Sequence, residues 1–532
     1  MKNFSLNAIH MAVSEELKMY VRRSSGLVKE ISAWDALIYN VLIMAPTAVY
    51  VYGVWALGIF PGVHLPTTVF LAMAISIVIG LYYAYMSIIM PRTGGDYIWV
   101  SRLIHPSIGF AINFFLFITL LSVAGSYVPW FTQYALSPLF EAYGMSDAVA
   151  WVNDPWNMFL IAVIFYVLIA LLMSRGVKVT KYAFWAFFLI ICAGVIAYAL
   201  TFYMMSPSTF QSSIASAYNF DANKIVSKAI ANGMPETFTL TATFSGVMFT
   251  ILNFLGFNNS VYLAGEIKEV RKSQLIAIIG AVLVFGLITY IIYDATYAGM
   301  GSNFIASLAY LFVNSPENYP LGETPPFFHM LAKNAVSPAV FTVIVCGFAA
   351  MTLSAILVYI FTTVRLLFAW SFDRIVPQFL SKVDSRYGTP YTALITVTVV
   401  AIVAQYLWLF TPLLNYFVFV VLGWGIMTFV ASAAGIVLPY RRKELLELAP
   451  AVVRRKVAGV PVLVILATLS AILSIWLAWV GTEPAVSGLT PDAVIFLIGI
   501  YVVGIIIYVI SSIYHRVKGI PLELAFKEFP PA

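Results

Sequence analysis

Long apolar runs alternate with short polar segments along the whole chain. Each run holds about 20 residues with few charges, the length that a helix needs to cross the hydrocarbon core of a bilayer. The pattern predicts twelve membrane-spanning helices, at residues 32–59, 66–90, 109–136, 157–173, 182–205, 240–266, 274–297, 337–372, 392–410, 414–438, 462–480 and 493–514. Runs of this length exclude a transmembrane β-barrel, whose strands have only about 9–11 alternating residues.

Two of the runs carry residues that interrupt a helix near its middle. The first contains Met-Ala-Pro-Thr at 44–47, and the sixth contains Asn-Phe-Leu-Gly-Phe-Asn-Asn at 253–259. Proline removes a backbone donor, and glycine with neighbouring asparagines weakens a helix. Either interruption alone is equally well explained by a kink. Paired interruptions at corresponding positions of two repeats are typical of a transporter binding site, and a channel would not need them.

We therefore expect an all-α integral membrane protein of twelve transmembrane helices. If spans one to five and six to ten are repeats, the odd number of spans gives them opposite topology and makes spans one and six equivalent. This predicts a five-plus-five inverted repeat followed by two C-terminal helices. The expected segments are an N-terminal segment (1–31), the first repeat (32–205), an outer loop (206–239), the second repeat (240–438), spans eleven and twelve with the preceding loop (439–517), and a tail (518–532).

The composition agrees with a membrane protein. Hydrophobic residues make up 62% of the 532 residues and charged residues only 10%, whereas soluble domains hold about 25% charged residues. So few charged side chains cannot cover a water-facing surface, which excludes a soluble protein. Cys192 and Cys346 both lie in apolar runs, where packed thiols are expected rather than a disulfide or a metal site.

The basic residues predict an orientation. With the N-terminus inside, all but three of the 29 Lys and Arg residues fall on the cytoplasmic side, the exceptions being Lys224, Lys228 and Lys333. Cytoplasmic loops of membrane proteins are enriched in basic residues. We therefore expect a multi-pass protein of the cell membrane with both termini cytoplasmic. Residues 1–29 lack the apolar core of a cleavable signal, so the first span is expected to remain uncleaved.

Groups that carry chemistry are scarce at mid-membrane depth. None of the five histidines has a partner at metal-ligand spacing, and no Ser or Cys stands beside a His base within a span. We expect no catalytic residue and no enzyme activity. The lack of buried charge also argues against a polyamine or cationic substrate. Asp35 is expected to anchor the N-terminal end of its helix, and Glu266 to pair with a nearby base such as Arg271.

Three stretches resemble the amino acid–polyamine–organocation (APC) superfamily of secondary transporters. Residues 90–97, Met-Pro-Arg-Thr-Gly-Gly-Asp-Tyr, are similar to the P-R-x-G-G-x-Y loop that follows span two in that family. Residues 254–257, Phe-Leu-Gly-Phe, with Glu266 and the basic loop behind them, are similar to its F-x-G-F segment. Residues 365–377 resemble the R-L-L-x-A…D-x-x-x-P end of its eighth helix. The likeness extends over nearly the full chain.

The resemblance implies a LeuT-type fold and a permease that moves amino acids across the cytoplasmic membrane by alternating access, as a symporter or an antiporter. The alternative is a carrier of another small polar solute, such as an organic cation or a nucleobase. The expected partners are the small-molecule amino acid and membrane lipid, with no nucleic acid, and the oligomeric state is left open. The chain departs from the family at 45–48, where members carry a Gly-rich break, and at Asn258, where some carry Glu. Span five also lacks the lysine of some proton-coupled members.

An amino acid can be held between the two breaks without any charged side chain. The break in span one is expected to offer free N–H groups at Thr47 and Ala48 to a carboxylate. The break in span six leaves carbonyls at 252–255 for an ammonium, with Gly256 allowing close approach and Asn258 bridging the breaks. The predicted substrate-binding residues are Ala45, Pro46, Thr47, Ala48, Leu252, Asn253, Phe254, Gly256 and Asn258.

The coupling ion is expected to be sodium or a proton, and no other cofactor is expected. Thr352 and Ser354 in span eight suit a sodium site together with carbonyls of the span-one break. Hydrogen bonds from these hydroxyls to their own helix are an equally good interpretation.

Overall fold

The computed structural model describes residues 27–412, 420–482, 491–519 and 522–527. Twelve helices in this part are long and apolar enough to cross a membrane, which confirms the all-α class and the predicted number of spans. They run Ala33–Ile59, Leu65–Ile89, Pro106–Ala142, Pro155–Ser174, Val177–Met204, Leu240–Glu266, Val270–Asn314, Pro338–Phe372, Tyr391–Phe410, Val420–Arg441, Val462–Val480 and Pro491–Val517. Residues 1–26, the start of the predicted tenth span at 414–419 and the end of the tail lie outside the described residues.

Thirteen labelled α-helices form the main part of the spans, because the first span is divided in two. They are α2 (Ala33–Ile43) with α3 (Val49–Ile59), α4 (Leu65–Ile89), α6 (Pro106–Phe131), α9 (Pro155–Ser174), α10 (Val177–Met204), α13 (Leu240–Phe254), α14 (Val270–Thr296), α17 (Pro338–Phe372), α18 (Tyr391–Phe410), α19 (Val420–Arg441), α22 (Val462–Val480) and α24 (Pro491–Val517). Spans three and seven end in the further helices α7 (Ser137–Ala142) and α15 (Ser302–Asn314). The connecting segments form α5 (Asp96–Leu103), α8 (Ser146–Asn153), α11 (Pro207–Tyr218), α12 (Ala222–Ala231), α16 (Phe328–Leu331), α20 (Lys443–Glu447), α21 (Ala451–Arg454) and an antiparallel pair of strands, β1 (Lys456–Val457) and β2 (Val460–Pro461).

Spans three and seven are longer than the apolar runs predicted. Each continues through a π-helical turn, η2 (Thr132–Leu136) or η4 (Tyr297–Gly301), into a further helix, α7 or α15. These extensions contain polar residues, so the hydropathy pattern ends before the helix does.

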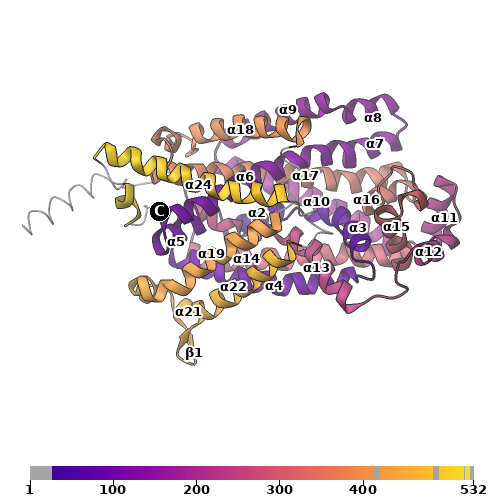
Figure 1. Ribbon diagram of the computed structural model, residues 1–532. Helices are drawn as coiled ribbons and strands as arrows, with labels where there is room; N and C mark the ends of the chain where they lie inside the picture. Colours follow the sequence, from indigo (N-terminus) through magenta and orange to yellow (C-terminus); the bar gives the residue numbers. More distant parts are fainter. Residues whose placement is uncertain (1–26, 413–419, 483–490, 520–521, 528–532) are drawn as a thin grey trace, which may run out of the picture.

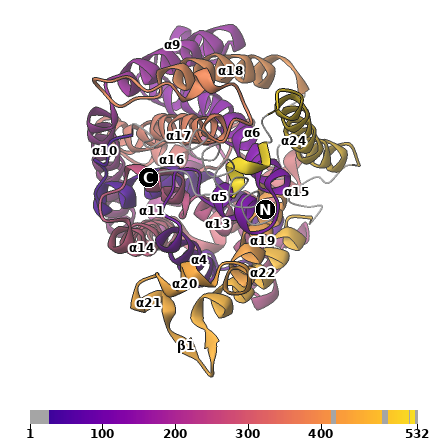
Figure 2. The ribbon, with the colours of Figure 1, turned by 90° about the vertical axis from the view of Figure 1, so that its left-hand side faces the viewer.

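The spans pack side by side with their axes along one common direction (Figure 1). The helices α11, α12 and α15 gather at one end of the bundle, which we call the α12 end, while α5, α21 and β1 lie toward the opposite α21 end. Figure 2 shows α9 beside α18 along one side and α19 beside α22 along another. The interrupted spans lie between these groups, with α2 packed on α14, α10 and α17, and α13 packed on α3 and α4.

The first span begins at a well-formed cap and breaks where predicted. The Ser32 hydroxyl accepts a hydrogen bond from the Asp35 backbone N–H, and the Asp35 carboxylate accepts one from the Ser32 N–H. This capping box confirms Asp35 as a helix-end anchor. The helix α2 stops before Ala45, which has the left-handed φ of 53°. Pro46 then opens the short 3₁₀ segment η1 (Pro46–Ala48), and the helix resumes as α3.

The sixth span is also interrupted as predicted, but its second part is not an α-helix. The helix α13 ends at Phe254, Gly256 adopts a φ of +107°, and the chain continues as the 3₁₀ helix η3 (Asn259–Glu266). A Cβ atom at Gly256 would lie 2.7 Å from Cγ2 of Ile43. Glycine is therefore needed both for the backbone angle and for the close approach of span six to the end of α2.

Hydrogen bonds hold the two interrupted spans together on the side of the α21 end. The Ser260 N–H donates to the side-chain oxygen of Asn40 at 2.8 Å, and the Asn40 amide donates to the Ser260 hydroxyl at 3.0 Å. Further along, the Ile31 N–H donates to the Glu266 carbonyl at 3.0 Å. The segment before the break in span one and the segment after the break in span six thus run side by side.

Candidate functional site

A cavity of about 640 Å³ lies where the two interrupted spans meet. Its walls come from α2, α3, α6, α13, α17, α18 and α19, together with the turn after α13. Pockets for small molecules usually measure about 300–1,000 Å³. The cavity therefore has the size and the central position of a small-molecule binding site.

Two helix C-termini converge on this cavity. Ile43 and Met44 line it from the end of α2, and Leu252 and Asn253 line it from the last turn of α13. The C-terminal end of a helix carries partial negative charge from its unsatisfied carbonyls. Since both ends face the same space, this part of the cavity favours a cationic group such as an ammonium.

Several buried polar atoms at the cavity have no hydrogen-bond partner among the described residues. They are Oγ1 of Thr119, Oγ of Ser122 and Oδ1 of Asn253. The Asn253 amide nitrogen is satisfied, because it donates to the Phe249 carbonyl at 3.0 Å. A buried polar atom without a partner is unfavourable, so these three atoms mark places where a bound polar ligand gains hydrogen bonds.

The structure brings three of the nine predicted binding residues to the cavity wall. These are Leu252, Asn253 and Gly256. The other six, Ala45, Pro46, Thr47, Ala48, Phe254 and Asn258, do not line the cavity and are buried behind it. In the first span Ile43 and Met44 take the place that the sequence assigned to the residues just after the break.

Two details of the predicted backbone chemistry differ from expectation. The Ala48 N–H is not free, because it donates to the Ala45 carbonyl at 3.0 Å in the 3₁₀ turn. The Leu252 and Phe254 carbonyls accept turn hydrogen bonds from Leu255 and Phe257 at 3.3 and 3.2 Å. A carbonyl has two lone pairs, so these two oxygens can still accept a second hydrogen bond from a ligand.

The sequence reasoning missed the residues that α6 and α17 contribute. Tyr127 and Trp130 lie one turn apart on α6 and both face the cavity, and Tyr359 of α17 stacks on Tyr127 with a ring-centroid distance of 5.8 Å. The Tyr359 hydroxyl donates to the Ile43 carbonyl at 3.2 Å, which ties α17 to the break in span one. The three-residue spacing in α6 was the signal that could have found the first pair.

Thr352 and Ser354, the residues proposed for sodium, both bond to their own helix. The Thr352 hydroxyl donates to the Ala349 carbonyl at 2.7 Å, and the Ser354 hydroxyl donates to the Met351 carbonyl at 3.0 Å. Both side chains are fully buried. Their oxygens retain lone pairs for a cation, so their role as ligands stays a prediction. Within the described residues no group of three His, Cys, Asp or Glu side chains lies close enough together to hold a metal ion.

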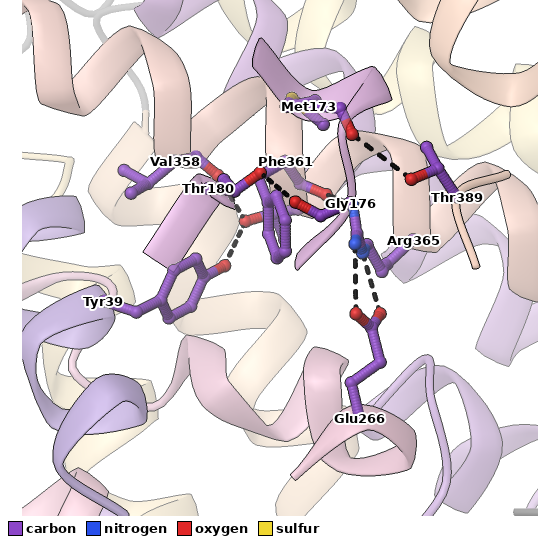
Figure 3. Close-up of polar contacts among 10 residues, drawn as sticks. Tyr39, Met173, Gly176, Thr180, Glu266, Val358, Phe361, Arg365 and Thr389 are labelled. Carbon is purple, nitrogen blue, oxygen red and sulfur yellow. Dashed lines mark hydrogen bonds and ion pairs between the residues drawn. The ribbon is translucent and has the colours of Figure 1, made fainter. Parts of the chain in front are cut away.

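Glu266 pairs with a basic residue, as expected, but that residue is Arg365 and not Arg271, the example that the sequence offered. The Arg365 Nε and Nη2 atoms donate to the two carboxylate oxygens of Glu266 at 2.9 and 3.1 Å (Figure 3). The guanidinium also lies 3.5 Å from the centre of the Phe361 ring. Arg271 is nearer in sequence but points away on the exposed start of α14, whereas η3 directs Glu266 inward against α17.

Asp96, at the start of α5, is buried and forms no ion pair within the described part of the chain. Its carboxylate accepts hydrogen bonds from the hydroxyls of Tyr262 and Tyr83 at 2.9 and 3.3 Å and from the Asn113 amide at 3.4 Å. Burial raises the pKa of this carboxyl to about 6, although these hydrogen bonds oppose the rise. The neighbouring buried carboxylate of Asp373, in contrast, forms an ion pair with Arg102 at 2.7 Å.

Comparisons with known proteins agree with this geometry. A family model described as "Amino acid permease" matches residues 34–509, which include both breaks and every residue that lines the cavity. The chain is also 25% identical over 207 residues to the glutamate/serine transporter AimA of Bacillus subtilis (strain 168). That alignment covers 39% of this chain and 33% of the relative, so the chain matches about a third of the relative's length.

Proposed function

Since the chain belongs to the amino acid permease family, and is thus a transporter rather than an enzyme, we propose that it is a secondary active transporter that moves amino acids across the cytoplasmic membrane by alternating access. The observation that carries this proposal is the cavity between the broken spans, where two helix C-termini and three unpaired polar atoms meet. An amino acid is small, polar at one end and zwitterionic, which matches this arrangement.

The ammonium of the substrate would sit between the ends of α2 and α13. There it gains the partial negative charge of both helix ends and a hydrogen bond to Oδ1 of Asn253. The carboxylate would accept hydrogen bonds from the hydroxyls of Thr119 and Ser122. Thr47, whose N–H the sequence predicted as a donor to this carboxylate, does not line the cavity.

Alternating access would follow from the division of spans one and six. A broken helix lets one half tilt while the other half stays packed, so access to the cavity can change from one side of the membrane to the other. The matching positions of the two breaks support a five-plus-five inverted repeat. The distribution of basic residues supports cytoplasmic termini, because Lys224 and Lys228 belong to α12 at one end, whereas Lys443 belongs to α20, which packs against α21 at the other.

Energy would come from a coupled ion, either sodium held by Thr352 and Ser354 or a proton. Sodium coupling is supported by the burial of both hydroxyls within α17 near the break in span one, against which α17 packs. Exchange of one amino acid for another is compatible with the same cavity.

A second candidate substrate is a nucleobase or an organic cation. Eight aromatic residues line the cavity, and aromatic faces stack on planar bases and attract cations. An amino acid is favoured because a nucleobase has no ammonium for the two helix ends.

Counterflow in proteoliposomes tests the proposal. Vesicles that contain the purified protein are loaded with one unlabelled amino acid at a time, and uptake of the same labelled amino acid is measured against empty vesicles. We expect saturable uptake that requires the internal substrate for at least one amino acid. Uptake that rises linearly with concentration would indicate a channel, and counterflow only with a nucleobase or an organic cation would replace the amino acid as substrate.

A further inference from the structure

Part of the cavity wall is built of aromatic rings. Tyr52, Tyr127, Trp130, Phe249 and Tyr359, which we call the aromatic wall, come from α3, α6, α13 and α17 and all line the cavity. Trp130 is at the centre of this wall, with ring centroids 5.6 Å from Tyr52 and 5.4 Å from Tyr127. Phe249 lies 6.4 Å from Tyr52. The wall is therefore one continuous surface.

On each of two antiparallel helices an aromatic residue is displaced from a polar residue toward the α12 end. On α13 the aromatic Phe249 precedes Asn253 by one turn, or about 6 Å along the axis. On α6, which runs in the opposite direction, Trp130 follows Ser122 by about 12 Å. In both helices the polar group is deep in the bundle and the ring is nearer to the α12 end. A substrate with its polar end at Asn253 and Ser122 therefore directs its side chain onto the aromatic wall.

The cavity carries no formal charge. None of the 25 residues that line it in the described part of the chain is Asp, Glu, Lys, Arg or His. A charged substrate side chain would lose its hydration shell without gaining a counter-ion, which is strongly unfavourable. The charged side chains of the protein's own ion pairs, such as Glu266 with Arg365, already bind each other and do not serve as counter-ions for a substrate.

We infer that the substrate is an amino acid with a bulky, uncharged side chain, aromatic or large aliphatic, which packs on the aromatic wall. This inference rests on the proposed function. It differs from the pair of substrates in the name of the similar Bacillus subtilis transporter. Glutamate would place a carboxylate against rings without a basic partner, and serine would leave the wall without contacts. Phenylalanine, tyrosine, tryptophan, leucine and methionine fill the space between the polar end and the wall.

Competition in proteoliposomes tests this inference. Counterflow of one labelled amino acid is measured against each of the twenty amino acids at a fixed concentration, and half-inhibitory concentrations are then determined for phenylalanine, leucine, serine, glutamate and lysine. We expect phenylalanine or leucine to inhibit about 10- to 100-fold more strongly than serine, and more strongly still than glutamate and lysine. Glutamate or serine as the strongest inhibitor would overturn the inference while leaving amino acid transport intact.

Failure of the proposed function gives a different result. If no amino acid supports counterflow and a nucleobase or an organic cation does, the proposed function fails and the inference fails with it. The two failures are thus distinguishable in the same set of vesicles.

A variant at the centre of the wall tests the geometry. Trp130→Ala is expected to weaken competition by phenylalanine about 3- to 10-fold, while competition by alanine changes less than about twofold. Trp479→Ala, at a tryptophan of α22 that is 69% exposed and does not line the cavity, is the matched control and should change neither. Trp130→Phe keeps an aromatic ring and is expected to retain most of the preference for phenylalanine over alanine. This second variant keeps the test valid if the alanine variant does not fold. Equal losses for phenylalanine and alanine in both Trp130 variants would contradict contact between the wall and the side chain.

Discussion

Glu266 and Arg365 form a closed, two-bond ion pair inside the bundle, with side chains 0% and 2% exposed. The pair joins η3, the second part of interrupted span six, to the C-terminal part of the long helix α17. Any movement of η3 away from α17 must separate these two charges. The pair therefore holds the α21-end half of span six in the position that the structure shows.

Breaking this pair from one side is expected to destabilise the protein strongly. Glu266→Gln leaves the buried guanidinium of Arg365 without its partner, and Arg365→Met leaves the buried carboxylate of Glu266 without its partner. Each variant should lose about 3–5 kcal/mol of unfolding free energy. The double variant should recover much of that loss, because it leaves no unpaired charge. Denaturant titration of the purified protein in detergent measures the unfolding free energy of all three variants. Single variants within about 0.5 kcal/mol of the parent would show that the pair adds no stability.

Accessibility labelling tests the predicted orientation. Asn219, at the end of α11, and Lys443, at the start of α20, are both exposed and belong to segments predicted on opposite sides. In a background with Cys192 and Cys346 replaced by Ala, a cysteine at 219 should react with a membrane-impermeant maleimide added to intact cells. A cysteine at 443 should react only after the cells are opened. The reverse pattern would contradict the cytoplasmic termini.

The pH dependence of stability should reveal the buried carboxyl of Asp96. Its pKa of about 6 in the folded protein is above the ordinary value of 3.8, so its contribution to stability is greatest below about pH 4 and is lost as the pH rises through about 6. At pH 7.5 Asp96→Asn should therefore melt at a higher temperature than the parent. The difference should shrink below pH 6 and disappear near pH 4.

A control variant separates this effect from a general change of charge. Asp147→Asn removes an exposed carboxylate of α8 and should give the same small difference throughout this pH range. An Asp96→Asn variant that is less stable than the parent at pH 7.5 would mean that the charged form is favoured in the fold.

Sodium coupling is tested at the two hydroxyls of α17. If Thr352 and Ser354 hold the ion, the Thr352→Val and Ser354→Ala variants should need about tenfold more sodium for half-maximal uptake, since each removes one oxygen ligand. Thr363→Val, which removes a hydroxyl that bonds to its own helix further along α17, is the control. Uptake that does not depend on sodium but stops when the proton gradient is dissipated would exclude the sodium site at Thr352 and Ser354.

The sequence predicted the features that depend on residues close together along the chain. Span number follows from hydropathy, the helix-end role of Asp35 from its place at the start of span one, and the two breaks from Pro46 and Gly256. The partners of long-range contacts could not be predicted in this way. Glu266 meets Arg365 because η3 is a 3₁₀ helix that turns the carboxylate inward, and no local pattern specifies that turn.

Most residues of the cavity wall could likewise not be predicted from the sequence. The chain contains 12 Trp, 31 Tyr and 40 Phe residues, and most positions of this kind pack against other helices or lipid. Which five form the aromatic wall depends on the rotation of α3, α6, α13 and α17 about their axes. The shift of the span-one contribution from Thr47 to Ile43 and Met44 has the same origin, because the direction of the 3₁₀ turn decides which residues face the cavity.

Binding to an Asn253→Leu variant tests most directly whether an amino acid sits between the two breaks. Leucine has a similar volume but lacks the unpaired Oδ1, so it removes a buried polar atom that has no partner in the empty protein. A structural role would make the variant less stable, whereas a binding role predicts unchanged or higher stability together with weaker binding. The measurement is equilibrium binding of a labelled transported amino acid, with melting temperature as the second readout and Asn303→Leu, at an exposed position of α15, as the control. Loss of a hydrogen bond to an ammonium, about 1.5–3 kcal/mol, should weaken binding by at least about tenfold in Asn253→Leu alone. An Asn253→Leu protein that binds as tightly as the parent would place the substrate elsewhere.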